Sequence, residues 1–378
     1  MGMQQSPRSA GVRIANNVIS PHPHLAEFEI WWRDHYHYLE EKGYKLRSRY
    51  SPDWVPSWTN TNKIDINCED GISSPHYLLL DARRIRDGAR VSLKCIDVTR
   101  HPHEIEIARY FCSSSLREDP ENHCVPIYDV LEVPNAKHLK ILVMPLLRNA
   151  ADPYFDTVGE VVDYVHQLFE GLRFMHRHHV AHRDCMQLNI LMDGSMFIDA
   201  WHPSEQFMSE DLKRAARHRT RTQSPPQYYY IDFGISRKYE ASNTDPLEDP
   251  IFGGDKDVPE FKEDNYKPRN PFPTDVWYLG HAIQETLLER YTGLEFLSGL
   301  VSDMMHSDPA QRPNMDEIFS RFQVLRQGFS SCKLRSRVAH DDERSFFDLL
   351  VHWARRTQYI IHLSVVVTGN WRQSQGYM

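Results

Sequence analysis

The chain has 378 residues and a formal net charge of −8, with 40% hydrophobic and 11% aromatic residues. The apolar content is that of a packed globular protein, and the acidic balance argues against a general nucleic-acid binder. The 21 histidines and six cysteines form neither a C-x-x-C pair nor an H-E-x-x-H run, so the sequence predicts no zinc site.

The cysteines and the first residues bear on the cellular setting. Unpaired cysteine spacing without a signal peptide indicates a reducing compartment, and we expect an intracellular, cytoplasmic protein. No apolar run reaches the ~18–20 residues that a membrane helix needs, so no transmembrane segment is expected. The start Met1-Gly2-Met3-Gln4-Gln5-Ser6 fits a short myristoylation pattern at Gly2, and a single acyl chain anchors a protein only marginally.

Residues 1–75 are expected to form an arm, one helix and an aromatic strap. Periodicity is weak at the start, whereas apolar residues recur at helical spacing from 25 to 39. The segment 46–58, which follows, is rich in aromatic residues and proline. We expect its Trp54 and Trp58 to pack onto the neighbouring lobe, with a partner-binding surface as the alternative.

Residues 76–147 are expected to form a small antiparallel sheet with one helix. Two apolar runs flank the turn Asp87-Gly88, and Asp-Gly is a strong hairpin signal. The predicted strands cover 77–82, 90–96, 125–131 and 139–144, and the predicted helix covers 102–111.

Residues 148–328 are expected to be mainly helical, and residues 329–378 to form a tail. A long helix with an apolar stripe is predicted from 158 to 179, and helical spacing dominates from 274 to 327. The tail contains a second amphipathic stretch, 346–359. A strand-rich part followed by a helix-rich part predicts an α+β fold.

The most informative residues run from His182 to Asn189 and from Tyr230 to Gly234. They place Asp184, then Asn189 five residues later, then Asp232 before Phe-Gly. Phosphoryl transfer needs one carboxylate to orient the attacking hydroxyl, and a carboxamide oxygen and a second carboxylate to hold Mg²⁺ against the phosphates. The order H-R-D-x-x-x-x-N, then D-F-G, resembles the eukaryotic protein kinase superfamily.

Further motifs extend this resemblance across about residues 76–328. They resemble the A-P-E, D-x-W-x-L-G and D-P-x-x-R-P segments of protein kinases, and small-molecule phosphotransferases usually lack them. Within the superfamily, the chain is similar to a fungal protein-kinase-like group with an H-R-D-C-M loop and a Leu-Arg-x-Arg-Tyr-x-Pro-x-Trp strap. The segments are 258–260, 275–280, 308–313 and, for the strap, 46–54.

The resemblance implies a bilobal fold that binds ATP and Mg²⁺. Asp184 would orient the acceptor hydroxyl, and Asn189 and Asp232 would hold the metal. Lys94, in Val91-Ser92-Leu93-Lys94, would neutralise the α- and β-phosphates with a carboxylate from the predicted helix. Glu104 and Glu106 both qualify, and the apolar spacing after Glu104 favours it.

The segment 139–147 would carry the adenine contacts. The resemblance places Met144 at the gatekeeper position. Pro145 would offer its carbonyl and Leu147 its N–H, so the proline removes no adenine contact. The resemblance also implies a buried ion pair between Glu260 and Arg312.

The sequence departs from the family around the transferred phosphate. The window 68–77, where a glycine-rich loop is expected, has one glycine, and such loops let backbone N–H groups approach phosphates. Met186 and Gly253 stand where serine/threonine kinases carry a Lys and a Thr. These substitutions weigh against peptide phosphorylation.

An extra segment separates Asn189 from Asp232, at about 194–227. It contains Lys213, Arg214, Arg217, Arg219 and Arg221. We expect a solvated helix and turn; the alternative is a basic flap that replaces the missing Lys near the phosphates.

The segment 236–258 is expected to work without phosphorylation. From 245 to 258 it has no Ser, Thr or Tyr, and it carries acidic residues of which one could pair permanently with Arg183.

The leading functional hypothesis is a protein kinase-like enzyme that transfers the ATP γ-phosphate to Ser or Thr hydroxyls of a protein substrate. The alternative is a pseudokinase, an ATP-binding or protein-interaction module with little turnover. Retained Lys94, Asp184, Asn189 and Asp232 favour the enzyme, and the poor glycine loop and Met186 favour the module.

Overall fold

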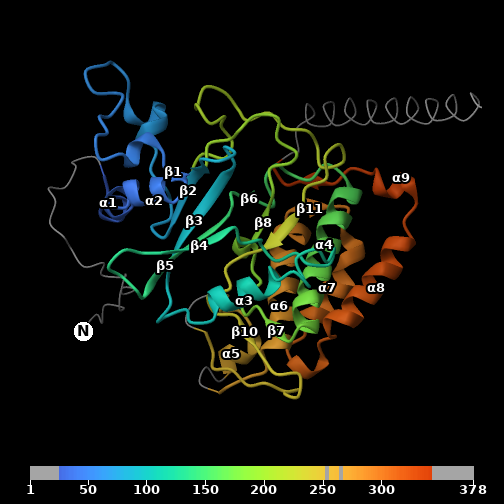
Figure 1. The fold of residues 1–378 in the computed structure, drawn as a ribbon. Helices are drawn as coiled ribbons and strands as arrows, with labels where there is room; N and C mark the ends of the chain where they lie inside the picture. The colour runs from blue at the N-terminus through green and yellow to red at the C-terminus, as the bar shows by residue number, and fades with distance from the viewer. Residues whose placement is uncertain (1–24, 252–254, 264–266, 343–378) are drawn as a thin grey trace, which may run out of the picture.

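The computed structural model describes residues 25–251, 255–263 and 267–342. Figure 1 shows a mixed α/β protein in which an antiparallel sheet lies beside a helix-rich part. The mixed class is therefore as expected, and the arrangement is compatible with two lobes. The Gly2 pattern, Gly253 and the stretch 346–359 lie outside the described residues. In the described part, no helix combines the length and apolarity needed to span a membrane.

Two short helices, α1 (Glu27–Asp34) and α2 (Tyr36–Glu41), replace the single helix predicted from 25 to 39. The break falls at His35, whose backbone leaves the helical region at φ −101° and ψ 6°. The His35 ring contacts the Trp31 carbonyl through Nδ1 at 2.7 Å. Periodicity alone did not reveal this interruption because the apolar stripe continues across it.

The sheet has five antiparallel strands in the order β1-β2-β3-β5-β4. The hairpin β2–β3 turns at Gly88, which has φ +70°, as its sequence predicted. The helix α3 (Glu104–Phe111) connects β3 to β4. The strand bounds are β1 Tyr44–Lys45, β2 Leu79–Arg84, β3 Arg90–Asp97, β4 Asp129–Glu132 and β5 Leu139–Pro145.

The strand predicted to start at 125 begins only at Asp129. Val125 donates its N–H to the Tyr230 carbonyl at 2.9 Å, so this stretch pairs with another part of the chain before it joins the sheet. β1 is too short to show a period and was not predicted. The connection from β1 to β2 holds the strap, with short 3₁₀ turns at Ser48–Tyr50, Asp65–Asn67 and Glu69–Gly71.

Side chains alternate between the two faces of the sheet. Leu80, Val91 and Leu93 pack with Trp31 and Trp32 in one hydrophobic cluster. Trp54 of the strap is buried and donates to Asp70 at 2.9 Å, whereas Trp58 is half-buried and contacts the Trp54 ring. The opposite face carries Leu79, Asp81, Ser92 and Lys94, and is called the Lys94 face below.

The helix-rich part surrounds α4 (Val158–Arg177), which the sequence predicted. Thr157 caps it by accepting the Glu160 N–H at 3.2 Å. The other helices are α5 (Pro259–Glu263), α6 (Pro271–Ile283) with the π-helical turn Gln284–Leu288, α7 (Ser298–Met304), α8 (Met315–Gln327) and α9 (Ser331–Leu334). Short strands complete it: β6 (Arg148–Asn149), β7 (Val180–Ala181), β8 (Ile190–Met192), β9 (Tyr228–Tyr230), β10 (Arg237–Lys238), β11 (Tyr291–Thr292) and β12 (Ala339–His340).

The segment 194–227, named the insertion here, joins β8 to β9. The prediction of a helix within it is wrong, because turns and isolated bridges fill the segment. Arg214 and Arg217 both pair with Asp199, and Arg221 is buried and donates to the Ala150 carbonyl at 2.7 Å. Arg214 and Arg217 therefore stabilise the insertion internally, and Arg221 anchors it to the segment that follows β6.

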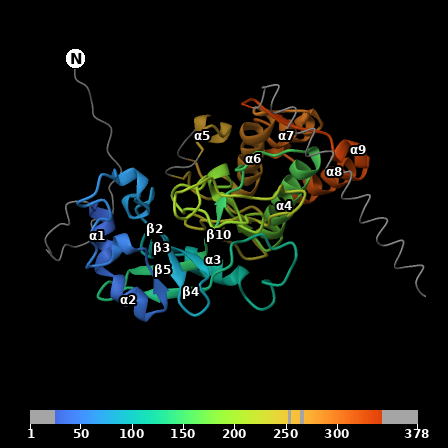
Figure 2. The same ribbon diagram turned by 90° about the horizontal axis from the view of Figure 1, so that it is seen from above.

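The insertion links the sheet to the helix-rich part. In Figures 1 and 2 it is drawn yellow-green and lies between them. Glu210 pairs with Arg83 of β2 at 2.5 Å, and the Arg90 guanidinium of β3 lies 4.3 Å from the Trp201 ring centre. On the other side, Thr222 donates to Glu160 of α4 at 2.7 Å.

A buried ion pair joins Glu260 to Arg312, as the resemblance implied. Two hydrogen bonds of 2.6 and 2.8 Å connect the guanidinium to the carboxylate. Thr274 donates to the same carboxylate at 2.9 Å, and Arg312 Nε donates to the His306 carbonyl at 2.8 Å. The pair fixes α5 against α6 and the segment before α8.

Replacing Arg312 with alanine should lower the free energy of unfolding by about 3–5 kcal/mol, because Glu260 would remain as an uncompensated buried charge. The matched control is Arg321→Ala, which breaks a half-exposed pair with Asp303 and should change stability by less than about 1 kcal/mol. Urea unfolding of the three proteins gives the comparison. Equal losses in both variants would contradict the structural role of the buried pair.

Candidate functional site

Lys94 lies in the middle of β3 and connects three elements. Its Nζ donates to Glu104 Oε1 of α3 at 2.5 Å and to Asp232 Oδ1 at 2.8 Å. Glu106, the other carboxylate considered, has a side chain that is 77% exposed. Two positions along an α-helix correspond to a rotation of about 200°, so Glu104 and Glu106 lie on nearly opposite sides of α3. Only one of them can therefore face the sheet. The structure places Glu104 there.

The charges at this contact support one another. Burial disfavours the Lys94 ammonium, but Glu104 and Asp232 outweigh it and raise the pKa of Lys94. Burial would also raise the pKa of Asp232, and the Lys94 charge together with the Gly234 N–H lowers it instead. At neutral pH the site thus presents a cation and an anion side by side. Glu104 Oε2 is buried and has no hydrogen-bond partner.

The loop from His182 to Asn189 is positioned by Asp275 of α6. Asp275 is fully buried and accepts the backbone N–H groups of His182 and Arg183 at 2.7 and 2.6 Å. Arg183 has φ +70°, a conformation that a non-glycine residue holds only where its surroundings fix it. The sequence motif contained Asp275, but its role as the anchor of this loop emerges only from the fold.

Asp184 and Asn189 lie together within this loop. Asn189 Nδ2 donates to the Asp184 carbonyl at 3.0 Å and to Asp184 Oδ2 at 2.8 Å. This orientation leaves the carboxamide oxygen of Asn189 for another partner. Asp184 Oδ1 is buried without a partner, and burial raises the pKa of this carboxyl group. An unpaired carboxylate oxygen in such a place suits a hydroxyl that donates to it.

Asp232 follows β9 in a left-handed backbone conformation, with φ +63°. Phe233 is buried beside Phe111 of α3 and the His182 ring, with ring centres 6.0 and 5.4 Å apart. The His182 ring also contacts the Ile231 carbonyl through Nε2 at 3.0 Å. Packing on both sides of Asp232 therefore holds its carboxylate against Lys94.

The oxygens of Asn189 and Asp232 fit a magnesium ion. Mg²⁺ prefers hard oxygen ligands and usually takes one or two from the protein, with the rest from water and phosphates. Within the described ranges, no three or more His, Cys, Asp or Glu side chains gather as a complete protein-only metal site. This donor set suits a cation that arrives with a phosphate ligand.

The expected adenine-contacting residues lie at the end of β5. Met144 is buried and pairs in register with Ser92, two residues before Lys94 on the neighbouring strand. Pro145 ends the strand, and Leu147 lies just before β6. The register thus places Met144 on the Lys94 face, whereas Pro145 stands opposite Val91, which lies on the other face.

The segment after Gly234 is held by Arg183. Arg183 is buried, pairs with Glu248 at 3.3 Å and donates to the Asp249 carbonyl at 2.6 Å. An acidic residue therefore pairs with Arg183, as we expected. Ser236 is buried and donates to the His182 carbonyl at 2.9 Å, whereas Ser242 and Thr244 are exposed.

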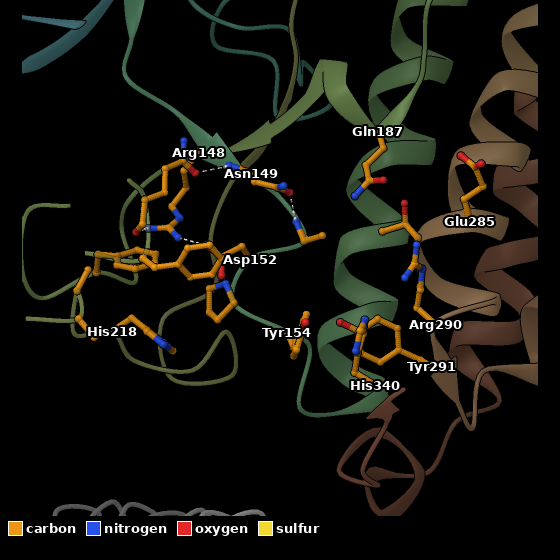
Figure 3. Close-up of a pocket in the computed structure, with 18 of the residues that line it drawn as sticks. Arg148, Asn149, Asp152, Tyr154, Gln187, His218, Glu285, Arg290, Tyr291 and His340 are labelled. Atoms are coloured by element: carbon orange, nitrogen blue, oxygen red, sulfur yellow. Dashed lines mark hydrogen bonds and ion pairs between the residues drawn. The ribbon is translucent and has the colours of Figure 1, made fainter. Parts of the chain in front are cut away.

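A cavity of about 810 Å³ lies beside the loop that carries Asp184. Figure 3 shows Arg148 and Asp152 on one side of it and Gln187 and Glu285 on the other. The insertion supplies part of the wall, including the exposed Phe207. Sequence reasoning missed this cavity because it is built from segments far apart in the chain.

A search of the chain against models of known protein families finds no match. The functional assignment therefore depends on the residues and contacts described above.

Replacing Glu248 with glutamine should loosen the segment 235–251, because the buried Arg183 charge would lose its carboxylate. Amide hydrogen exchange in this segment should become about tenfold faster, equivalent to ~1.4 kcal/mol. The double variant Ser242→Ala/Thr244→Val changes only exposed side chains and should exchange like the unmodified chain. Unchanged exchange in Glu248→Gln would show that the ion pair does not hold the segment.

Proposed function

We propose that this protein is a protein kinase-like phosphotransferase that moves the ATP γ-phosphate to Ser or Thr hydroxyls of a protein. The observation that carries the proposal is the contact of Lys94 with both Glu104 and Asp232. Transfer of the γ-phosphate requires a fixed cation that binds the α- and β-phosphates and, beside it, a carboxylate that binds their metal ion. The strand order β1-β2-β3-β5-β4, with α3 between β3 and β4, supports the same family of folds.

Each residue has a distinct part in this proposal. Lys94 binds the α- and β-phosphates, and Glu104 keeps its ammonium in place when Asp232 turns toward the metal. Asn189 and Asp232 supply the two protein oxygens for Mg²⁺. When bound, Mg²⁺ neutralises phosphate charge during transfer.

Asp184 is the proposed base. Its unpartnered Oδ1 accepts the proton of the acceptor hydroxyl, while Asn189 fixes the other oxygen. The cavity lined by Gln187 offers an acceptor chain room next to the loop that carries Asp184. The pairing of Arg183 with Glu248 supports an enzyme that needs no phosphate on its segment 236–251.

A second candidate function is a pseudokinase that binds ATP with little turnover. It is favoured by Met186, which provides no cation for the transferred phosphate, and by the window 68–77, which has one glycine where a glycine-rich loop was expected. Both candidates predict nucleotide binding, and only the enzyme predicts transfer.

Mg-ATP should raise the melting temperature of the protein, and Asp232→Asn should abolish this rise. At 100 times its Kd, a ligand adds about 2.7 kcal/mol of stability. Glu104→Gln should weaken the effect because Lys94 loses a partner. Glu106→Gln is the matched control and should respond like the unmodified chain, since its side chain is exposed. An equal rise in Asp232→Asn would refute the metal assignment.

The rate of phosphate transfer should fall as the pH falls through the pKa of Asp184. A base must be ionised, and burial raises this pKa above the usual value of about 3.9, so activity is present above the raised pKa and lost below it. Asp184→Asn should lower kcat by at least about 100-fold. Nucleotide binding without measurable transfer in the unmodified chain would instead support the pseudokinase.

A further inference from the structure

Gly234 follows Phe233 in the segment that carries Asp232, and polar side chains pack closely around it. A Cβ added at Gly234 would lie 3.0 Å from both Asp232 Oδ1 and His101 Nδ1, and 3.3 Å from Glu104 Oε2. His101 and Glu104 come from the start of α3, whereas Asp232 follows β9. The backbone of Gly234 therefore lies where the segment after β9 meets the start of α3.

The backbone of Gly234 is held through both its N–H and its carbonyl. The N–H donates to Asp232 Oδ1 at 3.2 Å, and the same oxygen accepts from Lys94 Nζ at 2.8 Å. The carbonyl oxygen lies 2.9 Å from His101 Nδ1. Because a carbonyl oxygen only accepts hydrogen bonds, Nδ1 must carry the proton and donate. His101 therefore fixes the residue whose N–H orients the Asp232 carboxylate.

His101 is itself fixed by the turn between β3 and α3. Its backbone N–H donates to the Asp97 carbonyl, at the end of β3, at 2.9 Å. Glu104, which contacts Lys94, follows only three residues later. One short stretch of the chain therefore holds the Lys94 ammonium through Glu104 and the backbone of Gly234 through His101.

The residues on either side of Gly234 are held by separate contacts. The Phe233 ring is buried, and Arg183 Nη1 donates to the Ile235 carbonyl at 3.2 Å. Rotation about the backbone bonds between these two anchors can still turn the Gly234 peptide groups, because glycine has few steric restrictions. The hydrogen bond from His101 resists that rotation.

We propose that His101 is a positioning residue that orients the Asp232 carboxylate for Mg²⁺. The inference rests on the proposed function and adds a residue that the H-R-D and D-F-G motifs do not contain. Lys94 and Gly234 both contact Oδ1, which leaves Oδ2 for the metal ion, and the Asp232 side chain is 45% exposed. Without the hydrogen bond from His101, the Gly234 backbone could turn and the carboxylate would lose its orientation. Groups that orient a metal ligand in this way contribute strongly to metal affinity.

Calorimetric titration of the full chain with ATP, with and without Mg²⁺, tests the proposal. His101→Leu removes the donor and should weaken Mg-ATP binding about tenfold. Binding of metal-free ATP should change by less than about twofold, because it depends on Lys94 and not on the metal. His101→Asn matches the leucine variant in shape, but its Nδ2 stands as far along the side chain as the histidine Nδ1 and can donate to the Gly234 carbonyl. This variant should restore most of the Mg-ATP affinity.

Amide hydrogen exchange without nucleotide measures the positioning itself. Exchange in residues 232–236 should become about fivefold faster in His101→Leu, the typical effect of one lost hydrogen bond, and should return toward the unmodified rate in His101→Asn. The matched control is His103→Leu, since the His103 side chain is 46% exposed and its nearest acidic group, Glu106, lies 3.9 Å away. The control should behave like the unmodified chain in both experiments.

Three results would overturn the role of His101 while the proposed function stands. The first is equal binding of Mg-ATP by the unmodified chain and His101→Leu. The second is equal weakening of Mg-ATP and metal-free ATP, because His101 would then act on Lys94 and not on Asp232. The third is a loss in His101→Leu that His101→Asn does not restore, because the hydrogen bond would then not be its cause.

A different result would remove the basis of the inference. If the unmodified chain does not bind Mg-ATP, the proposed function fails, and the role of His101 toward the metal fails with it. Urea unfolding of each variant identifies any that does not fold. If His101→Leu does not fold, His101→Ala also lacks the donor and takes its place in both experiments.

Discussion

The candidate site depends on the two ion pairs of Lys94, with Glu104 and with Asp232. Lys94 joins the sheet through β3, the helix α3 through Glu104, and the helix-rich part through Asp232. Glu104 is buried and would keep an uncompensated charge without Lys94, so α3 and the sheet are coupled electrostatically. The same side chain, Lys94, therefore fixes both the position of α3 relative to the sheet and the orientation of the Asp232 carboxylate. Packing of Phe233 on Phe111 reinforces the same arrangement.

The strap and the insertion form a second connection between the sheet and the helix-rich part. Together they are complementary, because the insertion places His202 against Arg47 and Glu69 of the strap, and Trp201 against Arg90. These contacts bring side chains of both segments to the level of Met144, because Arg47 contacts Asp81 and the Asp81 partner Ser92 is paired with Met144. Ordinary ion pairs and aromatic contacts account for this arrangement.

Turn residues and hydrophobic periodicity predicted helices and strands correctly where the structure of a segment depends mainly on its own residues. The Asp87-Gly88 turn and the apolar stripe of α4 predicted their elements within a few residues. Apolar spacing after Glu104 selected the carboxylate that contacts Lys94. Such signals work because turn chemistry and periodicity act within a few residues of each other.

The remaining features depend on contacts between distant segments. β1 has only two residues, too few to show a hydrophobic period. In the insertion, Arg214 and Arg217 pair with Asp199, about 15 residues away in sequence, and no local sequence pattern reveals that pairing; the prediction of a helix there was therefore wrong. The enclosure of Arg47 needs Asp81, Glu69 and His202, which come from three separate stretches of sequence. No single segment carries enough information to predict it.

A crystal structure with Mg²⁺ and a non-hydrolysable ATP analogue tests the central claim most directly. The account predicts a metal ion at about 2.0–2.1 Å from oxygens of Asn189 and Asp232, with Lys94 Nζ on the α- or β-phosphate and still bound to Glu104. A nucleotide bound elsewhere on the protein, or a metal that neither Asn189 nor Asp232 ligates, would contradict it.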